Sequence, residues 1–332
     1  MSINLPYLLF LGDAWDDLSA KTAIGVYQWR PDACVGQLRL PGCVPSVDLP
    51  ELTIAEGRER GARTLLVGVV NRGGVFSQAW IDTMVAALEA GMDIASGLHA
   101  RLGDIPAVAE TARRCGRRLH DVRHPEGDFP IGSGAPRNGR RLLTVGTDCS
   151  VGKMYTTLCL HRAFAARGVD SDFRATGQTG IFIEGSGVAV DAIVSDFMSG
   201  AIEQLCPAAD HDHWDLIEGQ GSLFHPSYAG VSLGLLHGAQ PDTLVLCHEP
   251  TRTHMRGLPG RALPDLASCI EANLAAARVV SGDVRFAGVS INTKDLEEKA
   301  ARTLLESCEK ELGLPCIDPA RDGADRIVDA IL

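Results

Sequence analysis

The sequence lacks the features that would assign it to a membrane, secreted or zinc-ribbon class of protein. Its ten cysteines include no Cys-x-x-Cys pair, so neither a zinc ribbon nor a thioredoxin-type dithiol is indicated. No run approaches the roughly 18 to 20 consecutive apolar residues that a membrane helix requires. Residues 1–11 are largely apolar, but no positive charge precedes them and aspartates follow closely, so we expect no secretory signal. We therefore expect a soluble, cytoplasmic protein with reduced thiols.

Positive charge and aromatic side chains are also scarce. Lysine and arginine number 31 against 42 acidic residues, and the formal net charge of −11 opposes binding to nucleic acid or to an anionic membrane. A short basic cluster at residues 113–118 has helical spacing and is interpreted as a solvated face. With 5% aromatic and 45% hydrophobic residues and 36 glycines, the composition is typical of a globular α/β protein. Its expected partners are a small-molecule substrate and further copies of the chain in a homo-oligomer.

The length of 332 residues favours two domains, and strands alternate with helices through both. In the first third, strands are predicted at 6–11, 64–70 and 93–96, with helices at 77–90 and 105–115. Further on, strands are predicted at 141–145, 215–218, 243–247 and 286–292, with helices at 191–205, 265–280 and 294–312. A stretch rich in proline and glycine separates the two series. We predict a parallel-sheet domain at 1–125, a linker at 126–140 and a second doubly wound α/β domain at 141–332.

The second domain opens with a P-loop pattern, G-T-D-C-S-V-G-K at residues 146–153, between an apolar strand and a helix. Its glycines let backbone N–H groups converge on a phosphate, the helix N-terminus adds positive potential, and the lysine adds a charge. The predicted cofactor-binding residues are Gly146, Thr147, Asp148, Cys149, Ser150, Val151, Gly152, Lys153 and Met154. Cys149 is not assigned as a nucleophile, because no adjacent base is evident.

One residue departs from the pattern of hydrolysing P-loop enzymes, which present a Ser or Thr hydroxyl to Mg²⁺ after the lysine. Here that residue is Met154, and a thioether is a poor ligand for a hard cation. We predict no metal ligands and expect magnesium-dependent phosphoryl transfer to be weakened or absent. A ligand whose pyrophosphate is bound but not cleaved fits this site, and coenzyme A is such a ligand.

Polar residues follow the predicted strands of the second domain, where open α/β sheets bind ligands. Glu218 ends one strand before a Gly-rich turn and is the best acid/base candidate, although a strand-end glutamate can also bond the next turn. His225 follows within the same loop, and His248 ends another strand. Arg252, together with Arg256, can clamp a carboxylate or a phosphate.

Other polar residues are candidates for substrate binding. Gln178 lies in a Gly-rich segment, 171–187, predicted as a strand and loop, and Gln220 lies in the loop after Glu218. Asp191 and Asp196 fall at the start of a predicted helix, where they either stabilise the first turn or hold the substrate amine.

Together these motifs resemble those of the DgcN family of D-amino-acid N-acetyltransferases. The resemblance rests on the P-loop, on residues 175–180 and 218–222, and on residues 97–99, and it covers nearly the whole chain. It implies a Rossmann-like N-terminal domain and a P-loop NTPase-like C-terminal domain. The C-terminal part is also similar, more distantly, to dethiobiotin synthetase, which has a comparable Gly-Thr-Asp P-loop and Glu-Gly loop.

The resemblance implies acetyl transfer from acetyl-CoA to the amine of D-glutamate or a related D-amino acid. Glu218 is then the first choice for the general base, and His248 or His225 the second. Lys153 and the loop amides would hold the CoA phosphates, and Arg252 would recognise the substrate carboxylate. Two alternatives stay open: an ATP-dependent ligase of the dethiobiotin synthetase sort, against which Met154 argues, and a non-catalytic nucleotide-sensing module.

Overall fold

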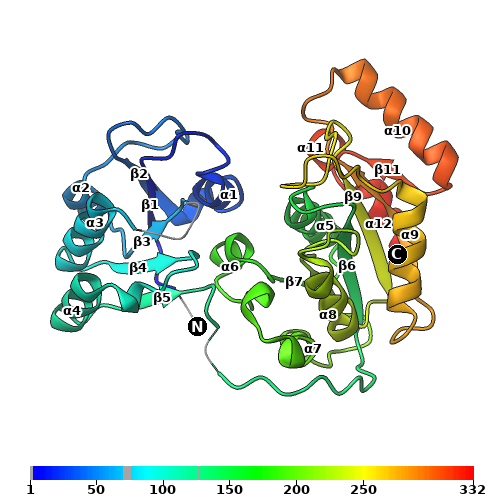
Figure 1. Cartoon of the computed structure of the whole chain (residues 1–332), viewed down its shortest axis with the longest axis horizontal. Helices are drawn as coiled ribbons and strands as arrows, with labels where there is room; N and C mark the ends of the chain where they lie inside the picture. The colour runs from blue at the N-terminus through cyan, green and yellow to red at the C-terminus, as the bar shows by residue number, and fades with distance from the viewer. Residues whose placement is uncertain (1–2, 70–75, 126) are drawn as a thin grey trace. The chain divides into compact units, whose positions relative to one another are not determined.

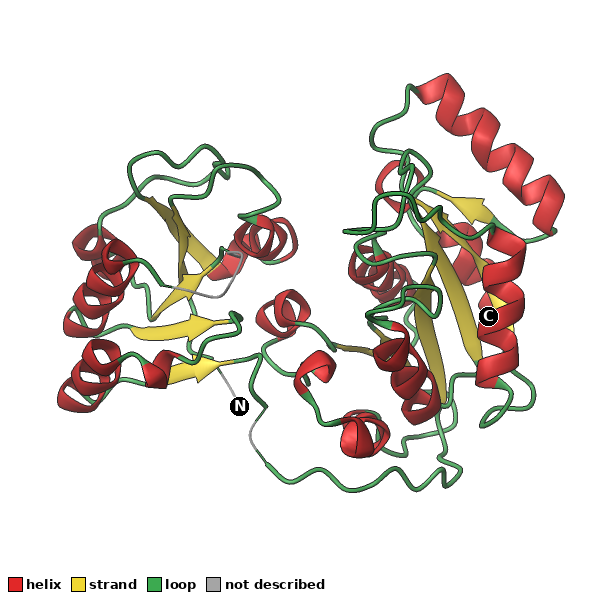
Figure 2. Cartoon of the chain, viewed as in Figure 1, coloured by secondary structure: helices red, strands yellow, loops and turns green. Residues whose placement is uncertain are grey.

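The computed structural model describes residues 3–69, 76–125 and 127–332. The chain divides into two compact units, one of residues 1–126 and 178–192 and the other of residues 127–177 and 193–332. Helices flank a parallel sheet in each unit (Figures 1 and 2). Among the described residues, every helix is too short or too polar to cross a bilayer. The predicted α/β class is thus confirmed, with one parallel sheet in each unit.

The first unit contains a five-stranded sheet in the order β2-β1-β3-β4-β5, the flavodoxin-like variant of the doubly wound arrangement. Its strands are β1 Tyr7–Gly12, β2 Cys34–Arg39, β3 Thr64–Val67, β4 Asp93–Ser96 and β5 Leu119–Asp121. Its helices are α1 Lys21–Trp29, α2 Ile54–Glu59, α3 Gln78–Glu89, α4 Pro106–Cys115 and α6 Gln178–Glu184. The predicted strand at 64–70 ends at Val67, and the last residue of that prediction lies outside the described residues.

Helix α6 belongs to the first unit although it follows the P-loop in sequence. It packs against α1 (Figure 1). The Tyr7 hydroxyl donates a hydrogen bond to the Phe182 carbonyl at 3.3 Å. Phe182 is almost fully buried. The chain therefore passes between the units three times, which differs from the predicted division into 1–125 and 141–332 with one linker.

The second unit contains a six-stranded parallel sheet in the order β11-β10-β9-β6-β8-β7. Its strands are β6 Arg140–Gly146, β7 Ser171–Arg174, β8 Trp214–Ile217, β9 Thr243–His248, β10 Arg285–Ile291 and β11 Cys316–Ile317. Its helices are α5 Lys153–Ala166, α7 Ser195–Leu205, α8 Ala229–Ala239, α9 Leu266–Ala277, α10 Glu298–Leu312, α11 Pro319–Asp322 and α12 Asp325–Ile331. Because β6 lies between β8 and β9, the loops that follow these three strands meet at one edge of the sheet.

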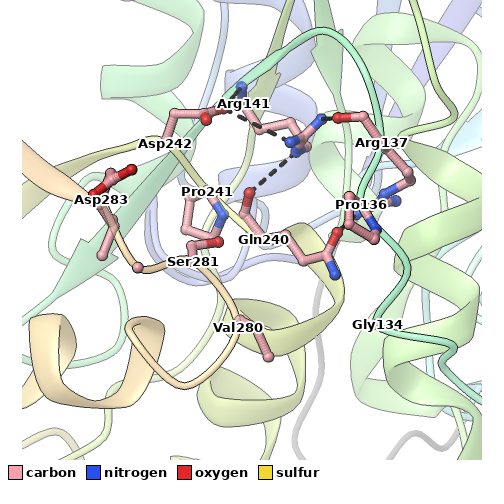
Figure 3. A pocket seen from close by; sticks show the side chains of 12 residues that line it. Gly134, Pro136, Arg137, Arg141, Gln240, Pro241, Asp242, Val280, Ser281 and Asp283 are labelled. Carbon is pink, nitrogen blue, oxygen red and sulfur yellow. Dashed lines mark hydrogen bonds and ion pairs between the residues drawn. The ribbon is translucent and has the colours of Figure 1, made fainter.

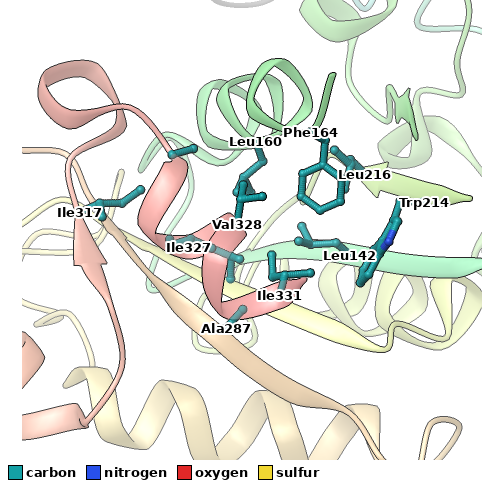
Figure 4. Close-up of a cluster of buried hydrophobic side chains, with 12 residues drawn as sticks. Leu142, Leu160, Phe164, Trp214, Leu216, Ala287, Ile317, Ile327, Val328 and Ile331 are labelled. Carbon is teal, nitrogen blue, oxygen red and sulfur yellow. The ribbon is translucent and has the colours of Figure 1, made fainter. Parts of the chain in front are cut away.

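A hydrophobic cluster between this sheet and helices α5 and α12 holds the P-loop helix in place (Figure 4). Leu160 and Phe164 of α5 pack with Ile327 and Val328 of α12 over the strands, and Phe164 meets Trp214 edge to face at 5.5 Å between ring centroids. Burying such side chains stabilises the fold by about 1.5–3 kcal/mol each. The P-loop thus rests on a rigid strand and a well-anchored helix.

Two predicted elements of the Gly-rich middle region agree with the structure only in part. The helix predicted at 191–205 is broken, because a short 3₁₀ helix, Val190–Ala192, precedes α7, which begins only at Ser195. The segment at 171–187, predicted as strand and loop, contains β7 followed by helix α6. In α6 the burial of the Ile181, Phe182 and Ile183 side chains outweighs the low helix propensity of its glycine.

Candidate active site

The P-loop connects β6 to α5 and encloses the amine of Lys153. The Lys153 Nζ donates a hydrogen bond to the Asp148 carbonyl at 2.8 Å, and only 6% of the residue is exposed. A Cβ atom on Gly146 would lie 3.0 Å from this Nζ, so the glycine leaves room for the ammonium. Burial lowers the pKa of Lys153. A bound phosphate would replace the lost hydration of this charge.

Asp148 gives the loop its shape. Its fully buried carboxylate accepts hydrogen bonds from the amide of Cys149, the guanidinium of Arg252 and the amide of Arg256, each at 2.7 Å. Burial alone would raise the pKa of Asp148, but the Arg256 amide and the Arg252 side chain together lower it. Asp148 is therefore an ionised structural anchor in the loop.

Glu218 follows β8 and is the most strongly perturbed carboxyl group of the site. Its Oε2 accepts hydrogen bonds from the amides of Thr176 at 3.0 Å and Gly177 at 3.1 Å, and its Oε1 from the Gln220 side chain at 3.1 Å. Burial raises the pKa of Glu218 to about 7, even though these three donors and the charge of Lys153 act in the opposite direction. A carboxyl group with this pKa can take up and release a proton near neutral pH.

The backbone after β8 approaches β6 very closely. A Cβ atom on Gly219 would lie 1.7 Å from the Thr144 carbonyl oxygen, while the Gly219 amide donates to the Thr144 hydroxyl at 3.0 Å. Only glycine allows this contact. The contact fixes Glu218 beside the strand that carries the P-loop.

The two histidines predicted as alternative bases have different surroundings. His225 is buried, and its Nδ1 accepts from the Ser227 amide at 3.2 Å, so its Nε2 carries the proton that it shares with the Arg256 carbonyl at 3.0 Å. Neither ring nitrogen of His225 keeps a lone pair for catalysis. His248 is only partly buried, its Nδ1 lies 3.0 Å from the Thr147 hydroxyl, and burial lowers its pKa.

The predicted substrate-binding residues fall in both units. Gln220 contacts Glu218, and Arg252 lies against the P-loop, whereas exposed Asp196 in the first turn of α7 has no recorded bond to the P-loop among the described residues. Gln178 and Asp191 belong to the first unit, where both accept hydrogen bonds from Arg123.

Some contacts of the site were not predicted, although Arg256 itself was named as a possible anion clamp. The amides of Thr176 and Gly177 hold Glu218, Glu249 holds the Arg252 Nε at 3.0 Å, and Arg256 contacts the Ser150 side chain. Gly177 carried a signal, since a Gly-rich turn after a strand exposes its amides. The contacts of Glu249 and Arg256 arise from a loop whose course no periodicity reveals.

A cavity of about 210 Å³ lies at the opposite end of the sheet, at the amino ends of β6 and β9 (Figure 3). Its two arginines, Arg137 and Arg141, donate mainly to backbone carbonyls, including those of Cys206, Gly238 and Gln240. These bonds satisfy the carboxyl ends of α7 and α8. The cavity is therefore a structural junction, and the reactive groups gather at the other end of the sheet.

The fold and the site define a P-loop protein joined to a Rossmann-like unit, and family comparison agrees. Residues 130–328 match the DUF1611 P-loop domain, and residues 40–125 match the DUF1611 N-terminal Rossmann-like domain. The chain belongs to the DUF1611 family.

Relatives and a solved structure match along almost the whole length. A protein of Tritonibacter scottomollicae named D-glutamate N-acetyltransferase is 55% identical over 329 residues, and one of a Pseudoalteromonas species with the same name is 49% identical over 328 residues. In both comparisons 99% of each chain is covered. The crystal structure of a DUF1611 family protein from Anabaena variabilis ATCC 29413 superposes with a TM-score of 0.89 at 34% identity, again over 99% of each chain.

Proposed function

We propose that this protein is a D-glutamate N-acetyltransferase that uses acetyl-CoA as its acetyl donor. The observation that carries the proposal is the full-length similarity to two relatives that bear this activity in their names. The site supports it with a phosphate-binding loop and a buried carboxyl group of pKa about 7 at the same edge of one sheet.

The reaction forms one bond and breaks another. The neutral amine nitrogen of D-glutamate attacks the thioester carbonyl carbon, a C–N bond forms, and the C–S bond breaks. The leaving thiolate takes up one proton, and the amine gives up one, so the products are N-acetyl-D-glutamate and coenzyme A. Because the unperturbed pKa of a thiol lies near roughly 8.5, the thiolate leaves without a strong general acid.

Glu218 is the group we propose to accept the amine proton. An ammonium ion is not a nucleophile, and a positioned base contributes roughly 100- to 10,000-fold to such a step. Glu218 is fixed by three N–H donors, and its raised pKa gives it more basicity than an ordinary carboxylate. His248 is the second candidate, because burial keeps its imidazole neutral.

The P-loop is proposed to hold the CoA phosphates through Lys153 and the amides of residues 147–152. Gln220 and Asp196 of the P-loop unit are proposed to bind the acceptor amino acid, and the substrate-binding roles of Gln178 and Asp191, which belong to the other unit, stay predictions. Arg252 was predicted to recognise the substrate carboxylate, but its N–H groups already bond to Asp148, Glu249 and the loop carbonyls. We therefore propose that Arg252 keeps the P-loop in shape.

The test is a thiol-release assay with acetyl-CoA and a panel of D- and L-amino acids. Release should be fastest with D-glutamate, and the product should carry one acetyl group by mass spectrometry. No release with any acceptor would contradict the proposal. Robust magnesium-dependent ATP hydrolysis would favour the ligase alternative, and ligand binding without turnover would favour the sensor.

The proposal extends to location and assembly. We propose that the protein acts in the reducing cytoplasm, where its ten cysteines would stay as thiols. Self-association as a homo-oligomer stays a prediction that analytical ultracentrifugation would check.

A further inference from the structure

The loop after β9 brings two arginines onto the P-loop. We propose that Arg256 supplies the bound diphosphate with the positive charge that magnesium supplies in hydrolysing P-loop enzymes. The site would then be a metal-independent site for an uncleaved diphosphate ester. This inference rests on the proposed function only for the identity of that ester, acetyl-CoA.

The residues around the P-loop do not fit a magnesium ion. Met154 stands where a hydroxyl ligand is needed, and a thioether does not replace it. The two threonines that follow along α5 are buried and bonded elsewhere: Thr156 lies 2.8 Å from the Ser290 hydroxyl, and Thr157 donates to the Lys153 carbonyl at 2.9 Å. The Asp148 carboxylate already accepts three hydrogen bonds. A diphosphate here must be neutralised by side-chain cations.

Arg252 is the anchor between the loop after β9 and the P-loop. Its Nη1 donates to the Asp148 carboxylate and the Cys149 carbonyl, both at 2.7 Å, and its Nη2 donates to the Ser150 carbonyl at 3.0 Å. Its Nε donates to Glu249 at 3.0 Å. With each nitrogen already bonded to protein, Arg252 determines the shape of the P-loop and has little capacity left for a ligand.

Arg256 has the opposite balance of contacts. Its backbone is held on both sides, since the amide donates to Asp148 at 2.7 Å and the carbonyl accepts from His225 at 3.0 Å. Its Nη1 donates to the hydroxyl of exposed Ser150 in the P-loop. In the described part of the chain, no bond is recorded for its Nε or Nη2, and the residue is partly exposed. A guanidinium with free donors is thus preorganised at the exposed side of the loop.

The chemistry of these groups matches a diphosphate. Lys153 lies within the loop and Arg256 beside it, so the two cations can neutralise two phosphate charges without a metal. A guanidinium presents paired N–H donors in a plane, which suits two phosphate oxygens better than an ammonium does. Because no metal polarises the phosphates, such a site binds a diphosphate without promoting its hydrolysis.

The experiment is calorimetric titration of the full-length protein with coenzyme A and, separately, with inorganic pyrophosphate. Each titration is run with excess EDTA and with magnesium. The parent protein should bind both probes with the same affinity in the two buffers. Arg256→Gln should weaken binding by about 10- to 100-fold, the usual loss for hydrogen bonds to a charged group. Arg113→Gln, which removes an exposed arginine from α4 in the other unit, is the matched control and should change nothing.

Weaker binding by Arg256→Gln would not come from a misfolded loop, because the hydrogen bonds from the Arg256 backbone to Asp148 and His225 do not depend on the side chain. Arg256→Lys should bind with intermediate affinity, since it keeps the charge and loses the paired donors. Loss of binding in EDTA, or an Arg256→Gln protein that binds as tightly as the parent, would overturn the inference. If both probes bind in an Arg256-dependent way but no acceptor releases thiol, the inference stands and the proposed function fails.

Discussion

At the scale of single residues, Glu218 combines two opposing effects. Burial favours its neutral acid, whereas two backbone amides, Gln220 and Lys153 favour the carboxylate, and the balance raises its pKa to about 7. A general base works best when its pKa lies near the working pH. The same burial that makes Glu218 costly for stability makes it suitable as a base.

Replacing this carboxyl group tests the proposed base directly. Glu218→Gln should lower kcat by about 100- to 10,000-fold, because the amide cannot accept the amine proton. The affinity for CoA should change little, since the P-loop contacts remain. The control is Glu306→Gln, on the exposed face of α10. A Glu218→Gln enzyme with parental kcat would assign the base elsewhere, first to His248.

The pKa of Glu218 also predicts the pH dependence of the reaction. In the free enzyme the base must be ionised, so kcat/KM should rise with pH and level off above about 7, near the pKa of Glu218. The measurement is kcat/KM for D-glutamate between pH 5.5 and 8.5 at saturating acetyl-CoA. A rate that is already level at pH 5.5 would rule out a base with this pKa.

At the scale of elements, the junction of β6 and β8 sets the position of the site. Gly219 lies against the backbone of Thr144, so β8 can deliver Glu218 next to the strand that begins the P-loop. Backbone contacts this close require the absence of a side chain.

Gly219→Ala should therefore destabilise the protein and also reduce activity. A Cβ atom 1.7 Å from the Thr144 carbonyl forces the two segments apart, and overpacking of this kind costs about 1–3 kcal/mol or more. Urea unfolding gives the change in stability. Gly230→Ala in α8, where no atom lies within 4 Å of the added Cβ, should be neutral or slightly stabilising. Equal stability of the two variants would contradict this packing.

An ion cluster whose charge depends on pH lies at the edge strand β7 and its neighbour β8 in the six-stranded sheet. Burial alone would lower the pKa of His213, but its Nδ1 bond to Asp170 at 2.8 Å and the charges of Asp215 and Asp172 raise it. Arg174 also bonds Asp215, at 2.6 Å, so three carboxylates share this cationic arginine and the histidine. The protonated histidine stabilises the native state because it is paired there and free in the unfolded chain.

The sign of this effect can be predicted. The folded pKa of His213 lies above its unfolded value near 6.5, so its stabilisation is fully present below about pH 6.5 and is lost as the pH rises through the folded value. The free energy of unfolding should therefore fall between pH 6 and 8 more steeply in the parent than in His213→Gln. His211→Gln, at an exposed neighbouring position, is the control. Parallel curves for the parent and His213→Gln would refute the effect.

At the scale of the whole molecule, the two units share one interrupted chain. Residues 178–192 leave the P-loop unit and complete the Rossmann-like unit, where Phe182 and Ile183 are buried. A single cut between residues 125 and 127 would therefore remove part of the hydrophobic core of the Rossmann-like unit and leave α6 on the other fragment without its partner.

Separated fragments test this arrangement. A fragment of residues 127–332 should expose the apolar face of α6 and aggregate or bind a hydrophobic dye. The same fragment with residues 178–192 replaced by a glycine-serine linker of equal length should stay soluble and melt cooperatively. Size-exclusion chromatography and dye fluorescence distinguish the two. Identical behaviour of both fragments would show that α6 needs no partner.

The sequence alone was sufficient for the α/β class and the P-loop, because these follow from local patterns. Apolar runs that end at a glycine predicted strands such as β4, which the structure has at the predicted residues, 93–96. The helix predicted from Ser77 to just before Gly91 is α3, and Ser77 caps its first turn. Short or edge elements such as β2 and β5, of six and three residues, were not among the predicted strands, since so few mixed residues carry little periodicity. The sequence also singled out Glu218, His248 and Lys153 as strand-end and loop residues.

Only the tertiary structure decided what these residues do to one another. The pKa of Glu218 depends on burial and on amides 41 and 42 positions away in the chain, and the bonds of Arg252 and Arg256 reach back more than 100 positions to the P-loop. The packing of helix α6 in the Rossmann-like unit also depends on residues far away in the sequence. A sequence records which groups can bind or react; desolvation and hydrogen-bond partners, which set their ionisation and geometry, exist only once distant segments pack together.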